Sequence, residues 1–318
     1  MLISISSMTL TQLEYIVALD TWRHFAVAAE KSFITQPTLS MQIQKLEEEL
    51  GVKLFDRTKQ PVMPTEIGSA IIAQARRTLR EAGMIRQLIS DQQDTLSGEL
   101  RIGIIPTLAP YLLPPLYKTM REKYPKLSLV IKESITEEVI HELKNNRLDC
   151  GIVVTPLKDA SIKEQVLFYE ELFVYVSARN ALSQKKYVLA TEIDPTQLWL
   201  LEEGHCFRSQ ILNLCELRKS SDFQFRYETG NMETLKRMVD KSDGITILPE
   251  LAVREFTPAQ LKLVKQLKQP SPAREVSLVT HRDHIKTRLI QTLKEEILHI
   301  VPRPMQKLQN KKVVEITY

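Results

Sequence analysis

The chain has 318 residues, 43% hydrophobic and 26% charged, a balance typical of a water-soluble protein with two or three structural units. No apolar run approaches the roughly 20 residues that a membrane-spanning helix needs, and the first residues lack the pattern of a signal peptide. We therefore expect a cytoplasmic protein without a membrane partner. The net charge of +4 is compatible with nucleic-acid binding but does not indicate it by itself.

Residues 8–65 show the pattern of several helices followed by a short hairpin. The alanine-rich segment 25–31 precedes a helix that Thr35 can cap and Gly51 ends. Small alanines let two helices approach closely, so the pair fits a helix-turn-helix whose second helix enters a major groove of DNA. The apolar face of this second helix consists of Leu39, Ile43 and Leu46.

The outward side chains of the second helix are candidates for contacts with double-stranded DNA. Polar side chains can reach base edges, whereas basic side chains suit phosphates. The candidate DNA-binding residues are Gln36, Pro37, Thr38, Ser40, Gln42, Lys45 and Arg57. On spacing alone, an ordinary helical domain with a solvated polar face is an equally good interpretation.

Residues 66–95 contain one long helical pattern whose apolar side includes Ile67, Ile71 and Ile85, with Leu79 flanking that stripe. Such a helix can pack on a partner chain, and Ile71 and Leu79 are the positions at which a charge would test that interface. The alternative is a helix that lies on its own domain.

From residue 98 onward strands and helices alternate, which predicts an open α/β sheet. The pattern restarts after residue 178, and the strand and helix at 275–300 are expected to return to the first lobe. This order predicts a domain over 98–302 with two lobes, about 98–172 with 273–302 and about 173–272, and a ligand-binding cleft between them. In the second lobe we expect strands at 198–204 and 223–229 and a helix through 207–217. The basic tail 303–318 is expected to be mobile.

The segment LLEEGHCFRSQILNLC carries the most chemistry. Cys206 follows Gly204 and begins a helix, and helix N-termini lower the pKa of a thiol, with help from His205 and Arg208 if they point inward. Cys215 follows nine residues later, near an apolar stripe formed by Phe207, Ile211 and Leu214.

In a reducing compartment, a disulfide between two of the three cysteines would be transient and regulatory. A lone cysteine is more often a small core residue, and we interpret Cys150 in this way. Only two thiols and one histidine cluster in the segment, without a CxxC pair, so no metal site is expected.

The runs LTQLEYIVAL, FAVAAEKSFITQPTLSMQIQKLEEELGVKLFDR and PTEIGSAIIAQAR resemble the N-terminal domain of LysR-type transcriptional regulators, and the resemblance extends over nearly the whole chain. It implies a multidomain α/β protein with a winged helix-turn-helix over 8–65, a linker dimerisation helix over 66–97 and a periplasmic-binding-protein-like effector domain. It also implies a homodimer that assembles into a homotetramer, with promoter DNA and RNA polymerase as partners.

The Gly-His-Cys motif with a second cysteine nine residues later resembles the OxyR-type branch of that family, as do IPTLAPYLLP and GNMETLKRMVDKSDGITILPELAV. This resemblance implies a sensor of hydrogen peroxide, with Cys206 as the peroxidatic thiol and Cys215 as the resolving thiol. It places Thr107, Thr136, His205 and Arg274 in the peroxide pocket. It further implies a thiol reductant of glutaredoxin or thioredoxin type and no cofactor. Phe207 is a mild departure, since a smaller aliphatic residue is common there.

Two other functions stay open at this point. The chain can be a LysR-type regulator that responds to a small metabolite bound in the interlobe cleft, with incidental cysteines. It can also be a thiol peroxidase or oxidoreductase, although an enzyme has no need of a DNA-reading domain. We therefore expect a regulator and not an enzyme.

Overall fold

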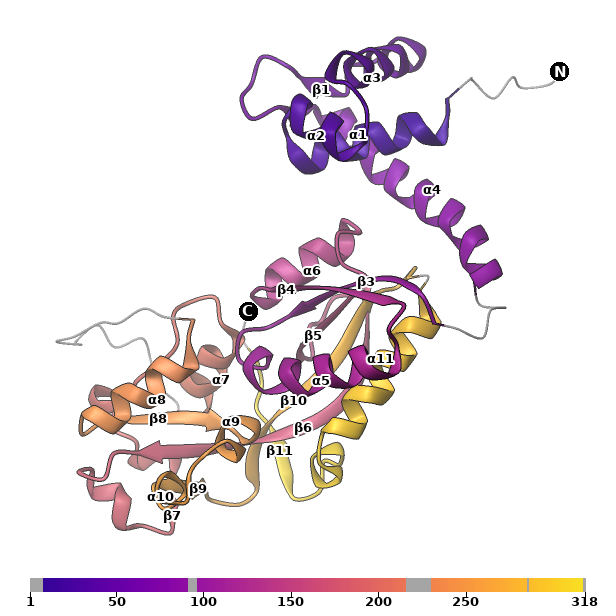
Figure 1. Cartoon of the computed structure of the whole chain (residues 1–318). Helices are drawn as coiled ribbons and strands as arrows, with labels where there is room; N and C mark the ends of the chain where they lie inside the picture. The colour runs from indigo at the N-terminus through magenta and orange to yellow at the C-terminus, as the bar shows by residue number, and fades with distance from the viewer. Residues whose placement is uncertain (1–7, 91–95, 216–229, 285, 317–318) are drawn as a thin grey trace. The chain divides into compact units, whose positions relative to one another are not determined.

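The computed structural model contains two compact units, up to residue 94 and from residue 95 onward (Figure 1). It describes residues 8–90, 96–215, 230–284 and 286–316. No helix in these ranges is both long and apolar enough to cross a membrane.

The first unit consists of three helices, a two-stranded hairpin and a long fourth helix. Its elements are α1 (Leu10–Trp22), α2 (Phe25–Lys31), α3 (Gln36–Leu50), β1 (Phe55–Asp56), β2 (Met63–Pro64) and α4 (Glu66–Ser90). Thr35 caps α3 by accepting a hydrogen bond from the Thr38 N–H, and Gly51 ends it with a left-handed φ of 68°. Because β1 and β2 pair antiparallel, the winged helix-turn-helix expected from the sequence is confirmed.

The long helix α4 is fixed to its own domain along its first half. Arg76 on α4 and Asp20 on α1 form a buried ion pair of 2.6 Å. Ile71 and Leu79 are half-buried and pack against the same core as α1 and α3, so a charge at either position would disturb this domain as well as any dimer interface. A helical stripe does not distinguish a partner chain from the helix's own domain. Residues 91–95 of the predicted helix lie outside the described ranges.

The second unit alternates strands and helices. Its elements before the crossing strand are β3 (Gly98–Ile104), α5 (Ala109–Lys123), β4 (Leu127–Glu133), α6 (Thr136–Lys144) and β5 (Cys150–Thr155). They are followed by β6 (Ile162–Val176), η1 (Ala181–Gln184), β7 (Tyr187–Val188), η2 (Ala190–Glu192), η3 (Pro195–Gln197) and α7 (Cys206–Leu214). The remaining elements are α8 (Met232–Lys241), β8 (Ile245–Pro249), α9 (Glu250–Arg254), α10 (Pro258–Leu261), β9 (Val264–Leu267), β10 (Ser271–His281), α11 (Thr287–Ile300), η4 (Arg303–Gln306) and β11 (Lys311–Val313).

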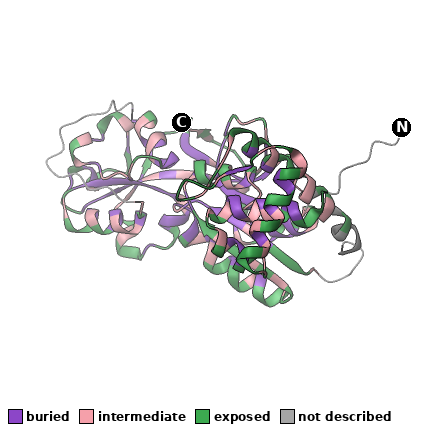
Figure 2. Ribbon diagram, turned by 90° about the horizontal axis from the view of Figure 1, so that it is seen from above, coloured by how far each residue is buried: buried purple, intermediate pink, exposed green. Residues whose placement is uncertain are grey.

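The long strand β6 joins two halves of one curled sheet with the order β4-β3-β5-β10-β6-β9-β7, with β8 also paired to β6. Up to Glu171, β6 pairs with β10, and from Leu172 it pairs with β8 and β9. Figure 2 shows these central strands as largely buried, with helices on the outside. The buried residues form one hydrophobic cluster in each half, which gives two lobes around two cores.

Two segments of the second lobe differ from the prediction or lie beyond what is described. Residues 198–204 form no strand, and only Leu198 bridges to Ile245. An apolar run cannot by itself distinguish a strand from a buried loop. The helix α7 ends at Leu214 with Cys215 as its C-cap. Residues 216–217 of the predicted helix and the strand predicted at 223–229 lie outside the described ranges.

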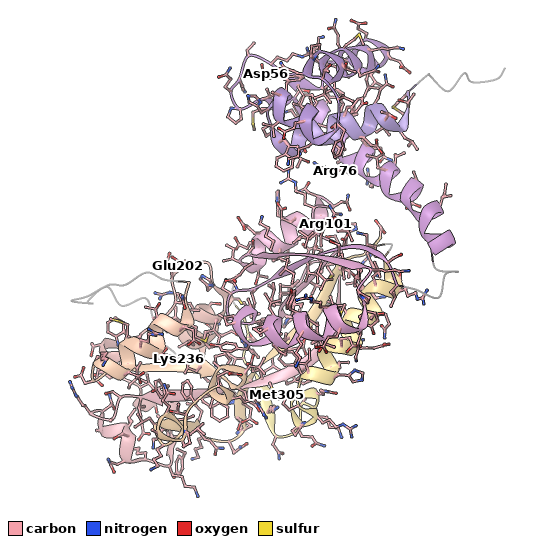
Figure 3. The ribbon with its side chains drawn as sticks, in the orientation of Figure 1. Asp56, Arg76, Arg101, Glu202, Lys236 and Met305 are labelled. Carbon is pink, nitrogen blue, oxygen red and sulfur yellow. The ribbon has the colours of Figure 1, made fainter. Side chains whose placement is uncertain are left out.

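The described part of the tail beyond α11, up to residue 316, is packed on the domain through η4 and β11, so the expectation that it is mobile was wrong there. β5 pairs with β10 only from Glu275 onward, and β11 fills the open edge beside Ser271–Ala273 as a parallel strand. Met305, labelled in Figure 3, and Ile316 are buried in the core of the first lobe. The apolar residues of this tail are spread out without helical or strand periodicity, so their burial is easily missed in the sequence.

Candidate functional site

Cys206 begins helix α7 and lies at the surface of the first lobe's core. Gly204 enters the helix with a φ of 92°, a backbone conformation that side chains with a Cβ rarely adopt. Cys206 is 9% exposed and belongs to the buried cluster of the first lobe. The Thr136 hydroxyl, at the start of α6, donates to the Cys206 Sγ over 3.7 Å. The structure thus brings Thr136 to the thiol, as the resemblance implied.

Arg274 is a fully buried cation that connects three elements behind this thiol. Its Nε lies 2.8 Å from Glu170 Oε2 on β6, and its Nη1 donates to the Thr107 Oγ1 over 2.7 Å. A second donor, Nη2, reaches the Thr107 carbonyl over 3.2 Å. The guanidinium also lies over the Phe207 ring, 5.0 Å from its centroid. Because every polar edge of Arg274 is used, its position is tightly defined.

The pKa of Cys206 is raised, contrary to the expectation from its place at a helix N-terminus. Burial is the main cause, because a thiolate loses solvation in a nonpolar environment. The Thr136 hydroxyl and the positive charge of Arg274 act in the opposite direction but do not outweigh burial. The thiol is therefore protonated in this conformation at neutral pH.

The two residues expected to assist the thiol are turned to other partners. His205 is buried, and its Nε2 lies 3.5 Å from Glu202 Oε1 (Glu202 is labelled in Figure 3). Gly230 also lies against this ring, since a Cβ there would come within 2.9 Å of His205 Nε2. Arg208 donates from Nη1 to the Leu201 carbonyl over 2.8 Å. Arg274, and not Arg208, supplies the positive charge near Cys206.

Cys215 lies at the opposite end of α7, in a different hydrophobic core. It is buried with Phe207 and Ile211 in the cluster of the second lobe, with Leu214 packed against that cluster, as the apolar stripe indicated. Burial raises the pKa of Cys215 to about 12. All three cysteines are free thiols, which makes this the reduced form. Cys150 is fully buried in β5, in agreement with its interpretation as a core residue.

The predicted DNA-binding residues lie on α3 and in the hairpin. Gln36, Pro37 and Lys45 are exposed, and Thr38, Ser40 and Gln42 are half-buried. The carboxylate of buried Glu47 accepts from the Leu54 N–H over 2.8 Å and from Arg57 Nη2 over 3.2 Å. Arg57 Nη1 also donates to the Ser40 hydroxyl. Glu47 therefore ties the hairpin to α3 and holds Arg57 beside the predicted reading face.

Two residues of the site were missed in the sequence. Glu170 pairs with Arg274 and also accepts from the Leu251 N–H over 2.8 Å. A carboxylate inside the apolar run VLFYEELFVYV was the available sign. Tyr111 on α5 donates to Glu233 on α8 over 2.7 Å and so connects the two lobes. Both partners lie in motifs that carried the resemblance, but their pairing spans 122 residues and leaves no mark on local periodicity.

Comparison with known proteins agrees with this geometry. Residues 10–69 match the family described as bacterial regulatory helix-turn-helix protein, lysR family, and residues 93–300 match the LysR substrate binding domain. A hydrogen peroxide-inducible genes activator from Haemophilus influenzae is 36% identical over 273 residues, which cover 86% of this chain and 90% of that protein.

Solved structures lead to the same group. A full-length OxyR variant from Pseudomonas aeruginosa is 34% identical with a TM-score of 0.78, covering 91% of this chain and 94% of that one. An OxyR mutant from Corynebacterium glutamicum, described as H2O2-bound, is 26% identical with a TM-score of 0.60, covering 92% of each chain. The chain therefore belongs to the LysR family of bacterial regulatory helix-turn-helix proteins and to its OxyR-type branch.

Proposed function

We propose that this chain is a DNA-binding transcription regulator of the oxidative stress response, which hydrogen peroxide activates through a reversible disulfide between Cys206 and Cys215. One observation carries the proposal: the Cys206 thiol meets the Thr136 hydroxyl and the field of Arg274, and a second thiol ends the same helix. The H2O2-bound description of the Corynebacterium relative supports peroxide as the signal.

The first step oxidises Cys206 to a sulfenic acid. The sulfur attacks one peroxide oxygen, the O–O bond breaks, and the departing oxygen leaves as water after it takes up the thiol proton. Thr107 has a role here because its oxygen already accepts from Arg274, which leaves its own O–H free to donate to a peroxide oxygen. Arg274 and Thr136 stabilise the negative charge that passes from sulfur to oxygen. The family resemblance also implies His205 for this pocket, and since its Nε2 faces Glu202 in this conformation, we propose that it turns toward the peroxide only when peroxide binds.

The second step joins the two sulfurs. The Cys215 thiol attacks the sulfenic acid of Cys206, the S–S bond forms, and one water leaves. Nine residues of helix separate the two Cα atoms by about 13.5 Å. A disulfide needs Cα atoms within about 7 Å. The bond therefore cannot form on intact α7, and the helix must unwind while Cys215 leaves the second lobe's core.

The domain organisation follows from the family. We propose that residues 8–65 bind promoter DNA, that 66–97 form the dimer, and that effector domains 98–302 assemble the homotetramer and alter its contact with RNA polymerase. A cytoplasmic thiol reductant of glutaredoxin or thioredoxin type returns the disulfide to two thiols. The chain consumes one peroxide in each cycle and acts as a sensor and not as an enzyme.

Transcription in vitro from a promoter bound by the full-length chain tests this function. Peroxide should raise transcription for the wild type and for Cys150→Ala, which serves as the matched cysteine control. Cys206→Ser should show no rise in transcription at any peroxide concentration. Cys215→Ser should form sulfenic acid at Cys206 without the full rise in transcription. A peroxide response that persists in Cys206→Ser, or activation by a metabolite in a variant without either thiol, would contradict the proposal.

A further inference from the structure

The C-terminal tail contacts the helix that carries the two cysteines. The tail segment, Lys311–Ile316, follows α11 and lies beyond residue 300, where the match to the family's substrate binding domain ends. Gln210 on α7 donates from Nε2 to the Val314 carbonyl over 3.1 Å. Asn213, one turn later, donates from Nδ2 to the Glu315 carbonyl over 3.1 Å. Both donors lie between Cys206 and Cys215.

The Gln210 side chain is buried although only part of its amide is hydrogen-bonded, and its bond to Val314 offsets part of the cost of that burial. It is 0% exposed, and its Oε1 has no hydrogen-bond partner within the described parts of the chain. A buried amide oxygen without a partner costs free energy, and the hydrogen bond of the amide nitrogen offsets part of that cost. The bond from its nitrogen to the tail is the interaction that this residue adds to the reduced state.

The tail segment is held independently of α7. β11 pairs with β10, and the Val314 N–H donates to the Ala273 carbonyl over 2.8 Å. Lys311 Nζ reaches the Tyr169 carbonyl on β6, and Ile316 is buried in the same cluster as Cys206. The tail is thus fixed to the central sheet beside Arg274, and α7 can leave it without unfolding it.

We propose that the tail segment is a positioning element for the thiol chemistry: it holds α7 in its helical form and so slows the step in which Cys215 reaches oxidised Cys206. The inference rests on the proposed function. In that step the sulfenic acid of Cys206 and the thiol of Cys215 give one disulfide and one water. Because both tail contacts must break before α7 unwinds, they act on this step and not on the attack of peroxide on Cys206.

The test follows both oxidation steps in the full-length chain by rapid mixing with peroxide, quenching and mass measurement. Gln210→Leu removes the donor at nearly equal volume and should speed disulfide formation about fivefold, the effect of one typical hydrogen bond. Asn213 is exposed, so Asn213→Ala should speed disulfide formation less, about twofold. The rate of sulfenic acid formation should not change in either variant.

Gln306→Leu is the matched control. Gln306 donates its amide to the carbonyls of Leu298 and Val301, in the same tail but away from α7, so disulfide formation should keep the wild-type rate. Equal acceleration in Gln306→Leu, or unchanged rates in both α7 variants, would overturn the inference. Should Gln210→Leu fold poorly, Asn213→Ala decides alone. A wild type that forms sulfenic acid but no Cys206–Cys215 disulfide would instead refute the proposed function.

Discussion

At the scale of single residues, the site resolves a conflict between burial and reactivity. Cys206 must lose its proton to attack peroxide as a thiolate, yet burial raises the pKa of its thiol. Thr136 and Arg274 act against that shift, and Glu170 keeps the buried guanidinium paired when peroxide is absent. A protonated thiol reacts slowly, which protects the reduced form from indiscriminate oxidation. In the proposed mechanism Thr107, Thr136 and Arg274 supply the donors for the peroxide oxygens.

This balance predicts how the rate of Cys206 oxidation depends on pH. The pKa of Cys206 lies above neutral pH, so near neutrality the fraction of thiolate rises about tenfold for each pH unit. The rate constant for oxidation of Cys206 by peroxide should rise in the same proportion. Thr136→Val removes a hydroxyl that lowers this pKa, so the profile should move to higher pH and the rate at pH 7 should fall about tenfold, the effect of losing one hydrogen bond to a charged group. Stopped-flow measurement of the oxidation rate across pH, in chains that also carry Cys215→Ser, gives both profiles.

Thr136→Ser provides the control for that experiment, because it keeps the hydroxyl and should retain the wild-type profile. If Thr136→Val keeps the wild-type profile as well, the hydroxyl has no part in controlling the thiol.

At the scale of elements, the alternating strands and helices from β3 to β5 and from α8 to β8 could be predicted because their periodicity is local. The loop at 198–204 could not, since Leu198 and Trp199 contact β8 across 47 residues. The same limit applies to Thr107 and Arg274, whose hydrogen bond spans 167 residues. Family resemblance, and not spacing, placed those two residues in one pocket.

The structure also revises where α4 should meet a partner chain. Ile71 and Leu79 face their own domain, whereas Ile67 and Ile85 are 49% and 66% exposed. Ile85→Glu should weaken the proposed dimer at least about tenfold, equivalent to about 1.4 kcal/mol, because it places a charge in an apolar interface. Ala73→Glu adds the same charge at an exposed position about 120° away around α4 and should leave the dimer intact.

Sedimentation equilibrium over a range of concentrations measures both variants. A dimer of Ile85→Glu as tight as that of Ala73→Glu would place the interface elsewhere.

At the scale of the whole effector unit, α7 spans two hydrophobic cores. Cys206 lies in the core of the first lobe, and Cys215 lies in that of the second. Arg208, Gln210 and Asn213 hold the helix between them through bonds to backbone carbonyls. A disulfide that pulls Cys215 out of its core converts a local redox event into a change of lobe packing, which is the bistable element that the covalent bond biases.

Hydrogen exchange on the reduced and oxidised full-length chain tests this central claim most directly. After peptide mapping has confirmed the Cys206–Cys215 bond, the amides of residues 207–215 should lose the protection of helical hydrogen bonds, while β6 and β10 should keep theirs. Unchanged protection across 207–215 in a chain that carries the disulfide would contradict the account.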